Sequence, residues 1–400
     1  MTQAIVARLG HKGDGIVESV NGRFHVPKVL AGEVLDLRDG RLHSILQPSP
    51  DRVPPFCSHY DTCGGCKFQH WRDEPYRIWK RGLVVEALDA RRIEAPVAEL
   101  IDAHGAGRRR VSLHVRLIEG VWRAGFMEQK THDLCAIDRC PVLVPALANA
   151  PAIAASFGSV LGPCDVALAA AANGIDVSVR AERKAVEKRF AALTELFHLN
   201  GLLRLSVNGE TYGMQSQPVV RVGRVDVPLP LQSFLQATIA GEEALAKLVL
   251  ASHPKKAKHV ADLFSGLGTF TFHLAEDLAV TAIDSDKPAI EALQKGMRAA
   301  QGLKPVEAVV RNLFNAPLTV MELKDFDWVV MNPPRAGAEA QSRTLAKSAV
   351  KHVTSVSCDV QSFARDAGIL IDGGFALKSV TPVDQFKWTA HVEVVGVFAR

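Results

Sequence analysis

The segment DLFSGLGTF (residues 262–270) decides the fold, because it places a glycine turn between an apolar strand-like run and a helical stretch. Gly266 and Gly268 allow the backbone to turn tightly and to approach a ligand. Strand-like runs then alternate with helical stretches to the end of the chain, which predicts a mostly parallel, doubly wound sheet. We expect an α/β, Rossmann-like domain over residues 226–400. The runs are HVADLF (259–264), AVTAID (279–284), EAVVRN (307–312), FDWVVMN (326–332), HVTSVSC (352–358), GFALKSV (374–380) and HVEVVGVF (391–398).

Two further domains are predicted upstream of this unit. Residues 1–55 contain short alternating runs with glycine turns, among them GIVESVNGRFHVP (15–27) and EVLDLRD (33–39), which indicate a small β-barrel. Residues 56–225 mix a cysteine-rich knuckle, a helical stretch at 72–93 and both kinds of run, which favours a central α+β domain. Its strand-like runs are VSLHVRL (111–117), VWRAGF (121–126), IDVSVR (175–180) and LLRLSV (202–207).

The overall composition is that of a folded protein. The 400 residues are 48% hydrophobic and 22% charged, with a formal net charge of +4. This weakly basic balance is compatible with a polyanionic partner without requiring one. No run approaches the 18 apolar residues of a membrane span, and the first residues lack a secretion-signal pattern. We expect a cytoplasmic monomer that does not contact a membrane.

Seven cysteines are unevenly distributed, which suggests metal binding rather than disulfides. Cys57, Cys63 and Cys66 have the spacing C-x5-C-x2-C, and an all-thiolate site suits zinc or an iron–sulfur cluster. By spacing alone, Cys135 and Cys140 are equally good fourth ligands.

Asp284 ends the strand that follows the glycine turn, 18 residues beyond Gly266. An acidic residue at this place can bind both hydroxyls of a ribose. The turn is not the GxGxxG of a pyrophosphate binder, so a nucleoside cofactor such as S-adenosylmethionine fits better. The alternative role for Asp284 is a helix N-cap, since a helical run follows it.

The loop Asn332-Pro-Pro-Arg335 follows the apolar strand FDWVVM, at the ligand-binding edge of the predicted sheet. Two prolines stiffen this loop, which suits a side chain held against a substrate. A plain tight turn is the alternative.

Cys358 and Glu393 are the candidate catalytic residues. Cys358 follows a strand, where a thiol faces the active-site edge, although buried free cysteines are also common. Glu393 places a carboxylate in an apolar strand, which is costly unless it has a partner or lies on a solvated edge. A thiolate nucleophile, a carboxylate base and a methyl donor together predict methylation of uracil C5 through a covalent adduct.

Several ordered motifs resemble the RNA uracil-5 methyltransferase family, in its branch that carries an iron–sulfur cluster. The resemblance covers essentially the whole chain, and no single motif is as specific as the ordered set. The motifs are HKGDGIVESVNGRFHVPKVLAGE (11–33, similar to a TRAM domain), CSHYDTCGGCKFQH (57–70), FLQAT (234–238), DLFSGLGTF, RNLF (311–314), NPPRAG (332–337), SVSCDVQSFARD (355–366) and TAHVE (389–393).

The resemblance implies a role for each matching residue. It makes Cys358 the nucleophile, Glu393 the general base and S-adenosyl-L-methionine the methyl donor, within a methyltransferase domain of Rossmann type. It implies RNA as the partner, with rRNA favoured over tRNA. It also implies a [4Fe-4S] cluster held by Cys57, Cys63, Cys66 and Cys140. The cofactor positions are Gln236, Phe264, Thr269, Asp284 and Asn312, beside Gly266, Gly268 and Asn332.

Asn332 departs from the family, which usually has Asp before the two prolines. Asn keeps hydrogen bonding and loses the charge. The change leaves open two alternatives, a methyltransferase for exocyclic amines of bases and a catalytically silent RNA-binding protein. Both would leave Cys358 and Glu393 without roles.

Cationic and aromatic side chains are interleaved in residues 67–92, and three arginines follow at 108–110. This combination suits phosphates and unstacked bases, so we expect this side of the protein to face RNA. An ordinary amphipathic helix is the alternative for most of these residues. They are Lys67, Phe68, His70, Trp71, Arg72, Tyr76, Arg77, Trp79, Lys80, Arg81, Arg91, Arg92, Arg108, Arg109 and Arg110.

Overall fold

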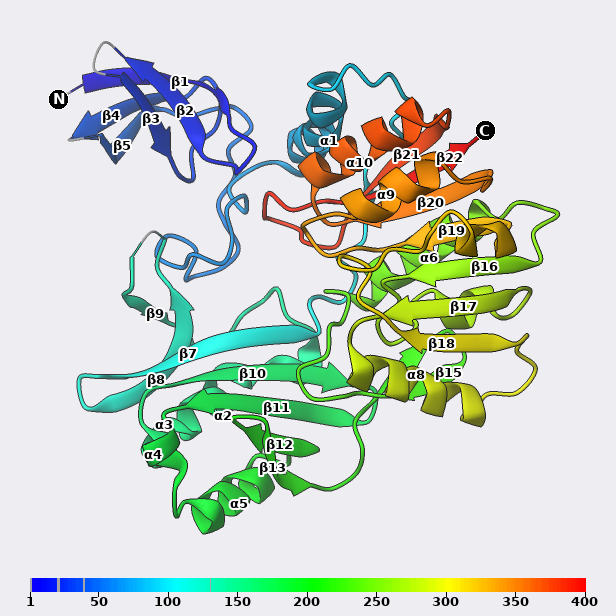
Figure 1. Cartoon of the computed structure of the whole chain (residues 1–400). Coiled ribbons are helices and arrows are strands. Elements are labelled where there is room, and N and C mark those ends of the chain that lie inside the picture. Colours follow the sequence, from blue (N-terminus) through cyan, green and yellow to red (C-terminus); the bar gives the residue numbers. More distant parts are fainter. Residues whose placement is uncertain (1, 20–21, 39, 130) are drawn as a thin grey trace.

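Three large sheets and a two-stranded hairpin organise the computed structural model, which describes residues 2–19, 22–38, 40–129 and 131–400 (Figure 1). The N-terminal sheet is antiparallel in the order β3-β2-β1-β4-β5, around buried valines and leucines. Its edges, β3 and β5, are not paired with each other in the described ranges, so closure into a barrel stays a prediction. The strands are β1 (Thr2–Leu9), β2 (Gly15–Ser19), β3 (Gly22–Val26), β4 (Val34–Arg38) and β5 (Arg41–Gln47). Within the predicted runs, residues 20, 21 and 39 lie outside the described ranges.

The central sheet has the order β13-β12-β11-β10-β7-β8-β9. The four predicted runs are strands, and β9, β10 and β13 were not predicted. β10 is alanine-rich, and alanine is depleted in strands. It is a strand because it pairs along its whole length with β11 and also pairs with β7. The strands are β7 (Arg110–Ile118), β8 (Val121–Met127), β9 (Leu134–Ala136), β10 (Cys164–Ala171), β11 (Gly174–Ala181), β12 (Arg204–Val207) and β13 (Glu210–Met214).

The C-terminal sheet has the order β18-β17-β16-β19-β20-β22-β21-β6 and confirms the predicted doubly wound arrangement. Strands β16 to β20 are parallel, whereas β22 inserts antiparallel between β20 and β21, which was not predicted. The strands are β6 (Ile101–Asp102), β16 (His259–Leu263), β17 (Ala279–Asp284), β18 (Val306–Val310), β19 (Trp328–Met331), β20 (His352–Ser357), β21 (Ala376–Asp384) and β22 (Glu393–Ala399).

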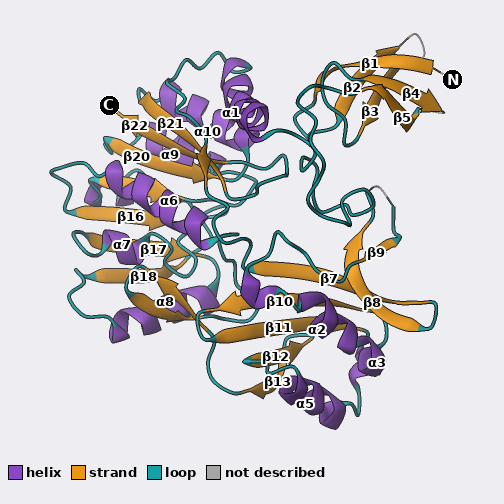
Figure 2. Cartoon of the chain, turned by 180° about the vertical axis from the view of Figure 1, so that it is seen from behind, coloured by secondary structure: helices purple, strands orange, loops and turns teal. Residues whose placement is uncertain are grey.

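Helices cover both faces of the C-terminal sheet, which explains its nearly continuous apolar strands. Val329 and Met331 of β19 pack in the core that contains α9 and α10, and Trp328 and Val330 pack in the core that contains α6 (Figures 1 and 2). No helix within the described ranges combines the length and apolar character that a membrane span needs. The helices are α1 (Asp73–Asp89), α2 (Ala150–Ser156), α3 (Gly158–Leu161), α4 (Arg183–Val186), α5 (Phe190–Leu199), α6 (Ile239–Ala251), α7 (Thr271–Leu274), α8 (Lys287–Ala299), α9 (Glu339–Ala346) and α10 (Val360–Asp372), with short 3-10 turns at Pro145–Leu147 and Glu322–Asp325.

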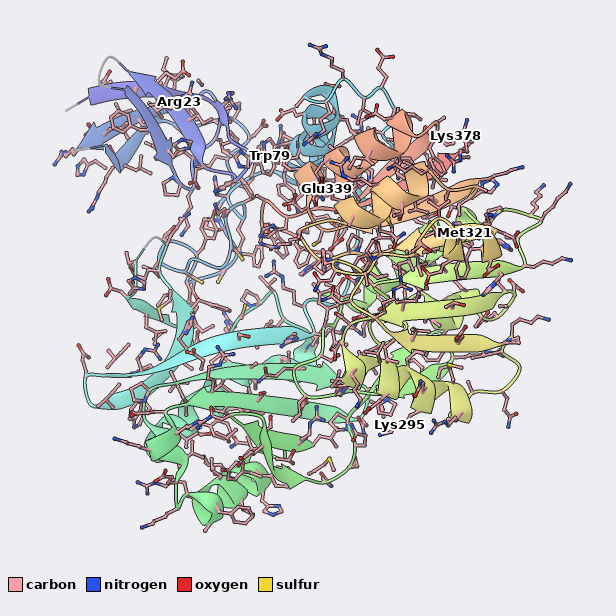
Figure 3. The ribbon with its side chains drawn as sticks, viewed as in Figure 1. Arg23, Trp79, Lys295, Met321, Glu339 and Lys378 are labelled. Carbon is pink, nitrogen blue, oxygen red and sulfur yellow. The ribbon has the colours of Figure 1, made fainter. Side chains whose placement is uncertain are left out.

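Helix α1 belongs to the C-terminal core, although it lies inside the predicted 56–225 segment. Helix α1 lies beside α10 (Figure 1). Val84 and Leu88 pack in the same core as α9 and α10, and β6 extends the C-terminal sheet beside β21. Trp79 lies on the part of α1 nearest the N-terminal sheet (Figure 3). The hairpin β14 (Val219–Val222) and β15 (Val225–Pro228) likewise packs against α8. The core of the C-terminal unit therefore includes residues that precede residue 226. The limits of the three predicted domains remain proposals.

Candidate active site

One edge of the C-terminal sheet gathers most of the predicted site residues. Parallel strands β16 to β20 all end there, and Leu263 is in register with both Ile283 and Met331. Because β22 is antiparallel to β20, its first residue, Glu393, lies at this same edge. Phe264, Asp284, Asn312, Asn332 and Cys358 each end a strand or follow one within two residues.

The glycine turn has the tight geometry expected from the sequence. Gly266 and Gly268 have φ values of 53° and 91°, a region that favours glycine. A Cβ on Gly268 would lie 2.8 Å from the ring of Phe272, so close packing also requires glycine there. Phe264 has a φ of 61°, which is strained for an aromatic residue, and Thr269 lies half-buried at the end of the turn.

Asp284 accepts one hydrogen bond from the glycine turn and one from the backbone just before α8. Its Oδ2 accepts from the Gly266 N–H at 2.8 Å, and its Oδ1 accepts from the Asp286 N–H at 2.8 Å. The N-cap of α8 is Asp286, whose side chain accepts from the Ala289 N–H. The alternative that Asp284 is the helix cap is therefore wrong.

An aromatic pair lies beside the turn. The ring centroids of Phe264 and Phe314 are 5.5 Å apart, and Phe314 is 45% exposed. The Oδ1 of Asn312 accepts from the Phe314 N–H at 2.9 Å and thereby orders the bend that carries this ring. Phe314 was missed in the sequence, although it lies only two residues beyond Asn312.

Asp262 is a second missed residue at this edge. It is fully buried, and its Oδ2 accepts from the Thr271 hydroxyl at 2.6 Å. Within the described part of the chain, its Oδ1 and the Oγ of buried Ser265 have no hydrogen-bond partner. Burial raises the pKa of Asp262 to about 7. A carboxylate inside the apolar run HVADLF was a usable signal, because buried polar atoms without partners are rare.

Cys358 and Glu393 are brought together by the ladder between β20 and β22. Ser357 pairs with Val394, and Cys358 and Glu393 occupy the next position on each strand. Cys358 is half-buried, immediately before Asp359, which caps α10. Burial raises the pKa of the Cys358 thiol to about 11, and the nearby charge of Glu393 adds to the rise.

Glu393 is buried, so the alternative of a carboxylate on a solvated edge is wrong. Burial raises its pKa to about 7. The Nε2 of Gln385 donates to Glu393 Oε1 at 3.0 Å and to Gln236 Oε1 at 2.6 Å. Gln385 was missed in the sequence, and it joins predicted cofactor residue Gln236 to the predicted base.

The Asn332–Arg335 loop lies beside the same group. The Asn332 N–H donates to the Leu263 carbonyl at 3.0 Å, which ties the loop to the start of the glycine turn. The Arg335 Nη2 lies 3.3 Å from His391 Nε2. The positive charge of Arg335 opposes the rise in the pKa of both Cys358 and Glu393. The loop therefore supplies the cationic side of the site.

The four cysteines implied by the family resemblance line one cavity of about 180 Å³. Buried Cys135 does not belong to that lining, and its Sγ lies 3.1 Å from the Thr62 hydroxyl. In the ranges that the structure describes, no three His, Cys, Asp or Glu side chains form a site for a single metal ion. The cavity lining includes Cys57, Cys63, Cys66 and Cys140.

Arg108 also lines this cavity and connects it to the loop before Glu393. Its Nη2 donates to the Lys387 carbonyl at 3.3 Å, whereas its buried Nε has no partner among the described residues. Burial raises the pKa of the Cys66 thiol to about 11, and the charge of Arg108 opposes this rise. A buried donor without an acceptor fits a cavity that holds an anionic group.

Two of the basic residues expected to face RNA are instead buried in ion pairs. Lys80 pairs with Asp384, and Arg109 pairs with Glu242. Arg91 and Arg92, just beyond α1, are exposed. Lys80 and Arg109 therefore lie neither on an RNA-facing surface nor on a solvated basic helix face, which was the alternative. The C-terminal end of the cationic segment is accessible.

Comparisons with known proteins agree with this architecture. The Methyltransferase small domain family model matches residues 241–356. The crystal structure of the Pyrococcus abyssi tRNA (uracil-54, C5)-methyltransferase in complex with S-adenosyl-L-homocysteine superposes with a TM-score of 0.77. It is 21% identical, and the match covers 99% of both chains. At this identity the likeness shows the fold.

Sequence relatives extend over the whole chain. An uncharacterized RNA methyltransferase from Brucella suis biovar 1 is 42% identical over 406 residues, covering 100% of this chain and 98% of the relative. The 23S rRNA (uracil(1939)-C(5))-methyltransferase RlmD from Chromohalobacter salexigens is 33% identical over 429 residues, covering 99% of this chain and 88% of the relative. The chain thus belongs to the S-adenosylmethionine-dependent RNA methyltransferase family.

Proposed function

We propose that this protein methylates C5 of a uridine in RNA, with Cys358 as nucleophile and Glu393 as general base. The observation that carries the proposal is their placement at the paired ends of β20 and β22, next to the glycine turn. A half-buried thiol beside a buried carboxylate has no evident structural purpose and has a clear chemical one.

Each residue has a defined step. Uracil C5 is a weak nucleophile, and addition of the Cys358 thiolate to C6 produces an enolate that makes C5 reactive. C5 then forms a bond to the methyl carbon of the sulfonium donor, and the S–CH₃ bond breaks so that its electron pair stays on sulfur as a neutral thioether. Glu393 removes the C5 proton, and elimination restores the C5–C6 double bond and frees the thiol. Arg335 favours the anionic forms of both catalytic groups.

The turn fits S-adenosyl-L-methionine, which supplies an electrophilic methyl group when bound. Asp284 is held where a carboxylate can bind ribose hydroxyls, and the exposed Phe314 ring beside Phe264 suits an adenine. The unpartnered Oδ1 of Asp262 and Oγ of Ser265 are ready to accept from a ligand donor. Gln236, Gly266, Gly268, Thr269, Asn312 and Asn332 complete the proposed cofactor site.

The cysteine cavity would hold a [4Fe-4S] cluster. Its support is that four cysteines line one cavity, because four thiolates are the ligand set of such a cluster. The presence of Cys140 and not Cys135 in the cavity lining supports Cys140 as the fourth ligand. The unpartnered Arg108 Nε would donate to cluster sulfur. The N-terminal sheet, resembling a TRAM domain, would contribute RNA contacts.

Ribosomal RNA is the proposed substrate class. The RlmD relative, whose name specifies 23S rRNA, is 33% identical, whereas the structural neighbour named for tRNA is 21% identical. RNA would bind across the exposed cations near Arg91 and Arg92.

Product analysis tests this function. The protein with its cofactors would be incubated with labelled S-adenosyl-L-methionine and total RNA from cells lacking it, and the nucleosides would be separated. We expect label in 5-methyluridine from large rRNA. Label on an exocyclic amine would instead support the amine methyltransferase that Asn332 suggests, and cofactor binding without transfer would support a silent RNA-binding protein.

A further inference from the structure

Gln385 occupies a fully buried position between the proposed cofactor site and the proposed base. It follows Asp384, the last residue of β21, and lies against the start of α6. A Cβ on Gly241 would lie only 2.7 Å from the Cβ of Gln385, so this approach requires a glycine on α6. The side chain is therefore held in place by packing.

Hydrogen bonds fix which way the Gln385 amide points. Its Oε1 accepts from the Ala237 N–H at 2.9 Å, which leaves the NH₂ group on the opposite side. That NH₂ group donates one proton to Gln236 Oε1 and the other to Glu393 Oε1, at 2.6 and 3.0 Å. A flipped amide would direct an oxygen at the Glu393 carboxylate and lose all three contacts.

This orientation defines what its two partners can do. The carbonyl oxygen of Gln236 is occupied, so its NH₂ group is left to donate toward a ligand. One oxygen of Glu393 is held, so the other is left to take a proton. The charged groups that act on Glu393 are Arg335 and Lys80, and the Cys358 thiol lies close enough for the charge of Glu393 to raise its pKa.

The residue next to Gln385 is anchored to α1. The Asp384 carboxylate accepts from the Tyr76 hydroxyl at 2.8 Å and pairs with the buried Lys80 ammonium. The Trp388 N–H donates to the same Tyr76 oxygen at 2.9 Å. The loop that carries Gln385 is therefore hydrogen-bonded to α1 both before Gln385, at Asp384, and after it, at Trp388.

We infer that Gln385 is a positioning residue that holds Glu393 for removal of the C5 proton and links its orientation to Gln236 in the cofactor site. The inference rests on the proposed function and deepens it. Gln385 touches no reacting atom and acts through the Gln236 and Glu393 side chains.

Replacement of Gln385 with methionine tests the inference, since methionine keeps the volume and removes the amide. Without this donor the Glu393 carboxylate is less stabilised relative to its protonated form. The acidic side, or limb, of the kcat–pH profile should therefore move up by about one pH unit. Proton removal follows methyl transfer, so the methylated covalent RNA adduct should accumulate. We expect kcat to fall about 10-fold or more, with KM for RNA changed by less than about 3-fold.

Gln341→Met is the matched control. Gln341 is a buried glutamine of α9 whose amide bonds to the backbone of Leu318, so the variant loses comparable structural hydrogen bonds away from the base. We expect it to lower the melting temperature without moving the pH limb. If Gln385→Met does not fold, Gln385→Glu serves in its place, because a second carboxylate beside Glu393 should move the limb in the same direction.

The outcomes separate this inference from the proposed function. Suppose that the wild-type protein makes 5-methyluridine and that a folded Gln385 variant has the same kcat–pH profile and adduct level as wild type. This result overturns the inference about Gln385 and leaves the proposed function intact. Equal limb shifts in the Gln341 and Gln385 variants also overturn it, because the effect would then be structural. Wild-type protein that never forms a covalent RNA adduct overturns the proposed function itself.

Discussion

Cys358 and Glu393 face each other one position beyond the last backbone pair of β20 and β22, Ser357 with Val394. Their approach is set by a hydrogen-bonded ladder inside the sheet and not by a loop. The two groups are thus held by rigid elements, which is the arrangement that suits precise proton and carbon chemistry. Replacing either side chain should change chemistry more than folding.

Cys358→Ala should lower methyl transfer by at least about a thousandfold, because the proposed mechanism activates C5 through the Cys358 thiolate. It should also abolish the covalent band that wild-type protein forms with RNA containing 5-fluorouridine, as seen in a denaturing gel. Cys164→Ala, which removes a buried thiol of the central sheet, should retain both. Activity retained by Cys358→Ala would refute the nucleophile assignment.

Glu393→Gln should slow turnover while allowing the adduct to form, since addition to C6 precedes proton removal. In wild type the raised pKa of Glu393, about 7, means that the base is protonated below that value. The rate should therefore rise with pH through about 7. A kcat profile measured from pH 5.5 to 9 checks this, and a flat acidic side would exclude Glu393 as the base.

Asp262→Asn should stabilise the protein at high pH. The folded-state pKa of Asp262, about 7, lies above its ordinary value of 3.8. The unfolded chain thus loses the proton first, and stability falls as pH rises from about 4 to 7. At pH 8 the variant should be more stable by on the order of 3 kcal/mol, and at pH 4 by much less. Denaturant unfolding at both pH values measures the difference, and an equal difference at both would contradict the argument.

Asp284→Asn should weaken binding of S-adenosyl-L-methionine by about 10-fold or more, because it loses the charge at the turn and a strong acceptor for the Gly266 N–H. Asp286→Ala is its control. That variant removes the α8 cap at a cost of about 1 kcal/mol in unfolding free energy but should leave cofactor affinity intact. Calorimetric titration distinguishes the two, and equal losses would reduce Asp284 to a structural role.

Cys140→Ser should lose most of the iron and acid-labile sulfide that wild-type protein retains after anaerobic reconstitution. Cys135→Ser should keep them, because Cys135 lies outside the cavity lined by the other four thiols. The iron content, the acid-labile sulfide content and the visible absorption of the cluster would be measured for both variants. The reverse result would make Cys135 the fourth ligand.

The repeated strand–helix runs were enough to predict the doubly wound sheet and the edge where Cys358 lies. They did not predict that Glu393 lies at the same edge, because this depends on the antiparallel direction of β22. Residues that stand out by type, such as a carboxylate in an apolar strand, could be found without a structure. Gln385 could not, because its importance depends on β22 inserting between β20 and β21. Nothing in the sequence distinguishes this glutamine from others, because its hydrogen-bond partners are brought to it by the non-sequential strand order.

The position of α1 was equally hidden. Its helical spacing was clear, but Lys80 finds its partner at Asp384, 304 residues away. Local pattern carries no information about so distant a pairing, so the sequence predicted the helix but not the core in which it packs. The alanine-rich strand β10 was not predicted for a related reason. Its pairing with β7 and β11 outweighs the low strand propensity of its alanines.

The late strand β22 lies inside its sheet and carries the proposed base, Glu393, as its first residue. On a translating ribosome, α1 emerges early, and its apolar face must wait for α10 and β21 to leave the exit tunnel. A premature stop codon shortly before residue 393 would remove an interior strand rather than an edge, and would leave the nascent chain unable to close this unit. Quality control of the polypeptide should therefore discriminate sharply between complete and slightly shortened chains.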